Sequence, residues 1–166
     1  QALYTLSLGI TVFTGGLLGF FLIAGSPRNP VARSFAVAAL WTTVWSLLLL
    51  FWQLATSAAA ALLFLQLGMI GAVLIPATYF NFTTRFAESI SNKKYALHRL
   101  ASYASGALFS LLLVSDIVLR TGFIAQRVVP KAWFPFWPDA GTFYAPYLFH
   151  FFGFFIAIGI HFCFTL

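Results

Sequence analysis

The stretch from Ala58 to Phe82 reads AAAALLFLQLGMIGAVLIPATYFNF and contains no Asp, Glu, Lys or Arg. A helix of about 20 apolar residues is long enough to cross the hydrocarbon core of a bilayer, which is roughly 30 Å thick. Backbone groups in hydrocarbon must form hydrogen bonds within their own segment, so a helix is the expected conformation. The stretch is therefore predicted to be a transmembrane helix.

The rest of the chain has the same character. Hydrophobic residues make up 61% of the 166 residues and charged residues 7%, whereas a soluble domain has about 25% charged residues. Four further apolar segments flank the first one, at about residues 3–24, 31–55, 100–119 and 145–166. The sequence predicts a single domain over residues 1–166, an all-α polytopic membrane bundle of five transmembrane helices.

The basic residues between the predicted spans indicate the orientation, because an excess of Lys and Arg marks the cytoplasmic side of a membrane. Six of them fall on one side, at positions 28, 33, 85, 93, 94 and 99, and three on the other, at 120, 127 and 131. The N-terminus is therefore predicted to lie outside. Since these residues are spread over short loops, the net charge of +6 does not predict nucleic-acid binding.

The longest predicted loop, residues 120–144, carries a dense aromatic segment between prolines. The candidates for an interface or a ligand contact are Trp133, Phe134, Phe136, Trp137 and Tyr144. Trp prefers the membrane–water interface, where the ring is in apolar surroundings and the N–H stays hydrated. Two interpretations stay open: an interfacial belt that lies on the bilayer, or a lid over a ligand pocket.

Two features near the ends of the spans predict local structure. Asp116 and Arg120 are four residues apart, so on a helix they share a face and are predicted to form an ion pair at the outer end of the fourth span. Pro76 lacks a backbone N–H and is predicted to kink the third span.

The last span carries two histidines on one helical face. His150 and His161 are separated by roughly 16 Å along the axis, and Gly153 and Ala157 lie between them on that face. A flat, imidazole-bearing stripe could hold a chlorophyll-type pigment or a haem through an axial ligand. The alternative is ordinary helix packing, with both imidazoles hydrogen-bonded to neighbouring helices.

Catalytic chemistry is not expected of this chain alone. We find no phosphate-binding loop, nucleophile elbow or zinc-protease motif, so no catalytic residue is predicted. Three acidic residues are too few for a carboxylate-rich metal site, and no metal site is predicted either.

Several short motifs suggest a known family. They are residues 26–35 (SPRNPVARSF) followed by Trp41 and Trp45, then Gln66, Gly71 and Pro76 before Phe80-Asn81-Phe82, and last the Gly-x-x-Tyr of residues 141–144. This pattern resembles the N-terminal seven-helix sensor region of bacterial histidine kinases, with five of the helices present. The resemblance implies a location in the bacterial plasma (inner) membrane and an output domain beyond these residues.

Two functions follow as hypotheses. The first is a non-catalytic signal-input module, which the resemblance implies. The second is a small accessory or scaffold subunit of a larger respiratory or photosynthetic membrane complex, which would contact other membrane subunits, lipid and a pigment or haem. A small transporter ranks last, because the spans lack paired ionisable residues and clear internal repeats.

Overall fold

The structure is a computed structural model that describes residues 2–91, 94–131 and 134–165, except for the side chains at positions 134, 161, 162, 164 and 165. It is 80% helical. In chain order the elements are α1 (Ala2–Gly25), α2 (Pro30–Leu54), α3 (Ala58–Ile90), α4 (Ala96–Leu119), β1 (Ala125–Lys131), β2 (Phe134–Ala140) and α5 (Tyr144–Thr165).

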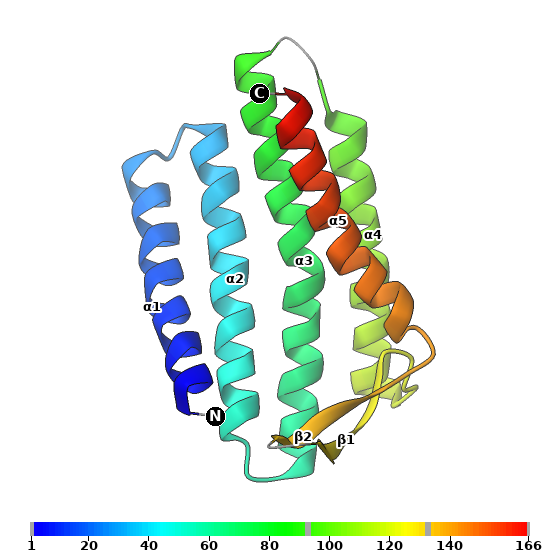
Figure 1. Ribbon diagram of the computed structural model, residues 1–166. Coiled ribbons are helices and arrows are strands. Elements are labelled where there is room, and N and C mark those ends of the chain that lie inside the picture. Colours follow the sequence, from blue (N-terminus) through cyan, green and yellow to red (C-terminus); the bar gives the residue numbers. More distant parts are fainter. Residues whose placement is uncertain (1, 92–93, 132–133, 166) are drawn as a thin grey trace.

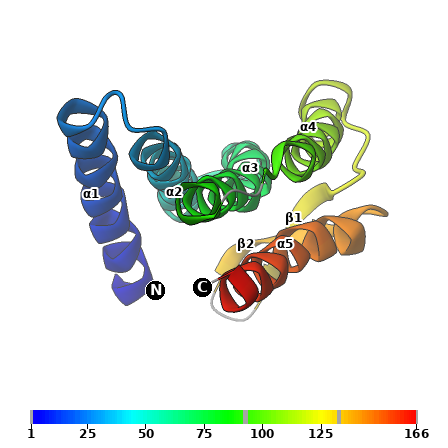
Figure 2. The ribbon, with the colours of Figure 1, turned by 90° about the horizontal axis from the view of Figure 1, so that it is seen from above.

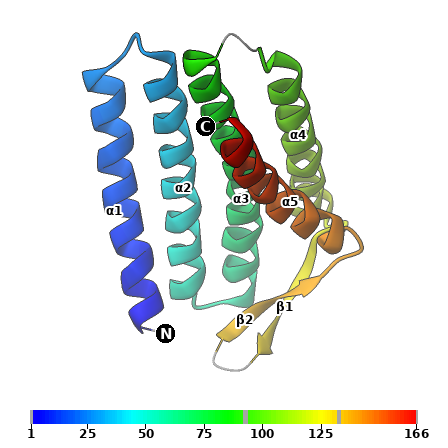
Figure 3. The same ribbon diagram turned by 45° about the horizontal axis from the view of Figure 1, so that its top comes forward.

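The first four helices stand side by side in one curved layer (Figures 1 and 2). Successive helices pack on one another along this layer, and α5 crosses one face of it to pack mainly on α3. The β1–β2 hairpin lies at the end of the bundle where the chain begins (Figure 3). We call this the hairpin end, and we call the opposite end, with the α1–α2 and α3–α4 connections, the connector end.

Short polar links set the boundaries of the central helices. Asn29 caps α2 by accepting hydrogen bonds from the amides of Val31 and Ala32, and Pro30 occupies the first turn, where its missing N–H costs nothing. Ser57 caps α3 in the same way through the amide of Ala60. These caps satisfy backbone donors that a helix start would otherwise leave unpaired.

Four helices, α1 to α4, are long and apolar enough to cross a membrane. This confirms the prediction of a helical membrane bundle, but a fifth span is not supported. The apolar part of α5 within the described residues runs from Tyr144 to Ile160. At 1.5 Å per residue it is about 25 Å long, less than the thickness of a typical hydrocarbon core.

The segment predicted as a long loop folds into a β-hairpin. β1 and β2 pair antiparallel, with Arg127 opposite Asp139 and Val129 opposite Trp137. The fold is thus an all-α bundle with one two-stranded ribbon. The prolines of this segment are compatible with strands because each strand of an isolated ribbon has one edge free of ladder hydrogen bonds.

Helix α3 is the centre of the packing. It contacts α2, α4 and α5 as well as both strands, and it continues as a helix through Pro76. The predicted kink stays a prediction. At the edge of the layer, Gly15 of α1 lies so close to α2 that a Cβ there would be 2.6 Å from the hydroxyl oxygen of Thr43, as expected for small residues at a membrane helix contact.

Candidate ligand pocket beneath the hairpin

A buried carboxylate fixes the start of the hairpin to α4. Asp116 is 2% exposed. Its Oδ1 accepts hydrogen bonds from the hydroxyl of Thr121 at 2.7 Å and the amide of Phe123 at 2.6 Å, and its Oδ2 accepts from the amides of Ile124 at 2.8 Å and Ala125 at 3.1 Å. Four donors to one carboxylate make this a strong, charge-assisted anchor.

The predicted ion pair between Asp116 and Arg120 is not formed among the described residues, whose salt bridges are Arg99–Glu88 and Arg127–Asp139. The reason is that α4 ends at Leu119. Arg120 is the C-cap residue, with a left-handed φ of 54°, so the four-residue helical spacing no longer applies to it. The backbone amides after Arg120 take the place of its guanidinium.

Two further hydrogen bonds tie the hairpin to the neighbouring helices. Gln66 of α3, which is buried, donates from Nε2 to the carbonyl of Ala125 at 3.0 Å. Trp52 of α2 donates from Nε1 to the carbonyl of Phe136 at 2.7 Å. The hairpin is therefore held by side chains from α2, α3 and α4.

Under β2 the bundle forms a partly open cavity of about 410 Å³, which we call the aromatic pocket. Its walls come from α1, α2, α3, α5 and β2, and its lining includes Trp45, Trp52, Met69, Trp137, Tyr147 and Phe151. Its rings are in contact: the ring centroids of Trp52 and Trp137 lie 6.3 Å apart and those of Trp45 and Phe151 6.5 Å apart. No charged side chain of the described residues lines it.

The aromatic loop residues have different positions. Trp137 and Tyr144 line the aromatic pocket, and Phe136 contributes the carbonyl that Trp52 binds. Trp133 and the side chain of Phe134 lie outside the described residues. A cavity thus lies beneath part of this segment, as the lid interpretation requires. The role of Trp52 was not predicted, because its indole N–H donates to a backbone carbonyl and no sequence motif indicates such a partner.

His150 joins three helices. It is 5% exposed. Its Nε2 lies 3.2 Å from the carbonyl of Val73 in α3, and its Nδ1 lies 2.8 Å from the hydroxyl of Ser105 in α4. A carbonyl can only accept, so Nε2 carries the hydrogen and Nδ1 accepts from the serine. Both nitrogens have partners, so an axial bond to a pigment or a haem would have to break one of these contacts.

Three residues of the predicted stripe line one groove, which is separate from the aromatic pocket. Gly153 and Ala157 line a groove of about 640 Å³ between α4 and α5, together with His150. The side chain of His161 lies outside the described residues. Among the residues that could be searched, no group of three or more His, Cys, Asp or Glu could hold a metal ion.

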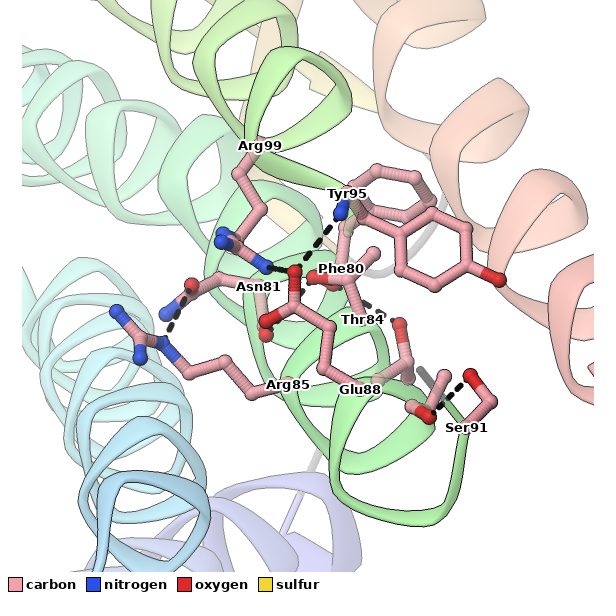
Figure 4. Close-up of polar contacts among 10 residues, drawn as sticks. Phe80, Asn81, Thr84, Arg85, Glu88, Ser91, Tyr95 and Arg99 are labelled. Atoms are coloured by element: carbon pink, nitrogen blue, oxygen red, sulfur yellow. Dashed lines mark hydrogen bonds and ion pairs between the residues drawn. The ribbon is translucent and has the colours of Figure 1, made fainter. Parts of the chain in front are cut away.

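Near the connector end a polar cluster links α3 to α4 (Figure 4). Glu88 forms an ion pair with Arg99 at 2.8 Å and accepts the amide of Tyr95 at 2.8 Å. Beside it, Arg85 donates from Nε to the side-chain oxygen of Asn81 at 3.1 Å. α3 has 33 residues, whereas about 20 cross a bilayer, so Glu88 lies beyond the membrane-spanning part.

This cluster predicts a dependence of stability on pH. Partial burial raises the pKa of Glu88, but the Tyr95 amide and the Arg99 guanidinium outweigh it, and the pKa is lowered from 4.5. The ionised form is thus favoured by folding, so its contribution is present above pH 4.5 and is lost as the pH falls through the lowered value. Unfolding titrations between acidic and neutral pH should show this loss, and Glu88→Gln should flatten the curve in that range. A Glu88→Gln variant whose stability depends on pH as steeply as that of the wild type would contradict this role of Glu88.

The described residues thus contain an aromatic pocket under the hairpin, a histidine-centred helix junction and a polar cluster near the connector end. A larger groove of about 820 Å³ runs along α1, where Leu6, Ile10 and Phe13 are exposed. No family model, no curated protein and no solved structure matches the chain.

Proposed function

We propose that the chain is the membrane-embedded, non-catalytic input module of a signalling protein, and that its signal is a small molecule bound in the aromatic pocket. The pocket is the observation that carries this proposal. Its volume of about 410 Å³ falls in the range of roughly 300–1,000 Å³ that is usual for small-molecule sites. The motif resemblance to the sensor region of bacterial histidine kinases points to the same function.

The lining defines the class of ligand. Aromatic and aliphatic side chains without a formal charge favour a neutral, flat and largely apolar molecule, which would stack on indole and phenol rings. A charged ligand would lose its hydration there without gaining a counter-ion. Such a molecule would reach the pocket through the bilayer or from the water layer above the hairpin.

The arrangement also supports a route for the signal. The pocket lies between α3 and α5 as well as under β2, and α5 contacts α3 again through His150 and Val73. A ligand that changes the spacing of these helices would displace the connector end of α3. By the distribution of basic residues the connector end would face the cytoplasm and the N-terminus would lie outside, and the resemblance to the sensor region implies a bacterial plasma membrane.

Tryptophan fluorescence tests the pocket directly. 1-Bromonaphthalene is a flat, neutral probe whose bromine quenches indole fluorescence, and Trp45, Trp52 and Trp137 all line the cavity. In phosphatidylcholine nanodiscs we expect saturable quenching of the wild-type protein. Ala72→Leu fills the pocket from α3, and we expect binding at least about tenfold weaker, which corresponds to roughly 1.4 kcal/mol.

Ala157→Leu is the matched control, because it adds the same atoms to the α4–α5 groove instead. It should leave saturable quenching unchanged. If the near-ultraviolet circular dichroism shows that Ala72→Leu changes the tertiary packing, Leu49→Phe is used in its place, because Leu49 lines the same pocket. Wild-type quenching that rises only linearly with the probe, as partitioning into lipid would give, refutes the pocket.

The accessory-subunit hypothesis keeps one supporting observation, the α4–α5 groove of about 640 Å³. A flat pigment or a partner helix could lie there against Gly153 and Ala157. An absorption spectrum and native mass spectrum of the protein taken from its own membrane decide between the two. Chromophore bands with partner subunits in fixed ratio favour a subunit, and a colourless protein of much higher mass favours a sensor.

A further inference from the structure

A second cavity lies on the other side of the hairpin root, between α3, the end of α4 and the start of β1. Its volume is about 370 Å³, and it shares no lining residue with the aromatic pocket. One wall is apolar, from Leu62 and Leu63 of α3 and Ile117 of α4, and the other is polar, from Gln66, Arg120 and Gln126. We call it the arginine pocket.

Two charged residues, Asp116 and Arg120, line this cavity, and among the described residues they do not pair with each other. Asp116 lines it, but both of its oxygens are bound by the four donors of residues 121–125. The other charged lining residue is Arg120, and its guanidinium has no ion-pair partner among the described residues. The polar wall therefore presents a guanidinium without an ion-pair partner in the described residues beside two side-chain amides, while the oxygens of Asp116, which keeps its charge, are occupied by the donors of residues 121–125.

The backbone at Arg120 also favours a role for its side chain. Its φ of 54° is a left-handed conformation that costs a residue with a Cβ roughly 1–2 kcal/mol. Glycine, or sometimes asparagine, is the usual residue where a helix ends in this conformation. Residues other than glycine that are held in such a conformation cluster at functional sites.

We propose that the arginine pocket binds an anionic amphiphile, with its head group on Arg120 and its apolar chain along Leu62, Leu63 and Ile117. A carboxylate or phosphate head suits a guanidinium because both can accept two parallel hydrogen bonds. The apolar wall suits a hydrocarbon chain. The source is either a soluble carboxylic amphiphile or an anionic lipid of the bilayer itself.

Thermal unfolding in phosphatidylcholine nanodiscs tests this proposal with octanoate as the probe. A ligand that binds the folded state raises the melting temperature in a saturable manner. We expect octanoate to do so in the wild-type protein and octanol, which lacks the charge, to give no saturable rise. Arg120→Gln should abolish the octanoate response, and Arg120→Lys should keep part of it.

Two controls separate binding from stability. Arg127→Gln removes an arginine of the same hairpin end that is 72% exposed and outside the pocket, and it should respond to octanoate as the wild type does. Arg120→Gly removes the backbone strain, so it should melt at a higher temperature without ligand and still not respond. An unchanged octanoate response in Arg120→Gln, or an equal response to octanol, overturns the proposal.

Changing the lipid of the nanodiscs identifies the source of the amphiphile. In nanodiscs containing phosphatidylglycerol, loss of the octanoate response together with a higher starting melting temperature, both dependent on Arg120, means that anionic lipid occupies the site. A retained response means that the site selects the soluble carboxylate. Both results support an anionic head on Arg120, and neither depends on quenching by 1-bromonaphthalene, which reports the aromatic pocket alone.

Discussion

Replacing Asp116 by alanine is expected to free the root of the hairpin and to lower the free energy of unfolding by roughly 3–5 kcal/mol, the usual cost of leaving buried charge-assisted hydrogen bonds unmade. Three backbone amides and the Thr121 hydroxyl lose their acceptor at once. Asp116→Asn should lose about half of this, because an amide oxygen can still accept while its NH₂ faces backbone donors. Thermal or denaturant unfolding in detergent measures the effect, and trypsin cleavage after Arg127 reports opening of the hairpin.

Asp139→Ala is the matched control in the same hairpin. Its carboxylate pairs with Arg127 at 2.8 Å, but the two side chains are 37% and 72% exposed. Exposed ion pairs contribute at most about 1 kcal/mol, so the change in stability should be small and trypsin cleavage should stay slow. Equal effects of Asp116→Ala and Asp139→Ala would show that the carboxylate of Asp116 does not anchor the hairpin.

The second large effect is expected from Gly141→Ala, where the chain passes from β2 to α5. The amide of Gly141 donates to the carbonyl of Ile124 at 2.9 Å, and an added Cβ would lie 2.5 Å from the carbonyl oxygen of Phe123. Because the colliding atoms are backbone, no rotamer change relieves the contact. We expect a loss of at least about 1–3 kcal/mol, as for an overpacked core, and weaker quenching by 1-bromonaphthalene because α5 would be displaced.

Gly9→Ala provides the comparison for Gly141→Ala. Gly9 lies within α1, about two turns from its start, and no heavy atom would lie within 4 Å of a Cβ there. Alanine there should be neutral or stabilise the helix by up to about 1 kcal/mol. Unfolding curves of both variants in the same detergent give the result, and a Gly141→Ala protein as stable as Gly9→Ala would mean that the hairpin root can move aside.

The membrane helices were predictable because lipid imposes one simple requirement, a long run of apolar residues. The segment Ala58–Phe82 lies within α3, and the predicted span at about residues 31–55 nearly coincides with α2, which runs from Pro30 to Leu54. The eight residues by which α3 continues past Phe82 to Ile90 were not foreseen. Their side chains are polar enough to be interpreted as a loop, although the ion pair of Glu88 with Arg99 stabilises them as helix.

The hairpin and its anchors were not predictable for a different reason. Prolines at 130, 135 and 138 argue against strands in a local sequence pattern, and the partners of Asp116 are backbone amides, which are the same for every residue type. Helical spacing therefore paired Asp116 with Arg120, although the helix ends between them. The same holds for His150, whose partners Val73 and Ser105 lie on other helices.

The hairpin anchors also set an order for assembly. The bond from Trp52 to Phe136 spans 84 residues and that from Gln66 to Ala125 spans 59, and contacts this distant in sequence form late because loop closure must precede them. The ribbon can dock only after α2, α3 and α4 have inserted and gathered. In a nascent chain with a misplaced helix, the aromatic ribbon would lie at the membrane surface without these hydrogen bonds to the helices. A docked hairpin therefore indicates that the bundle is completely assembled.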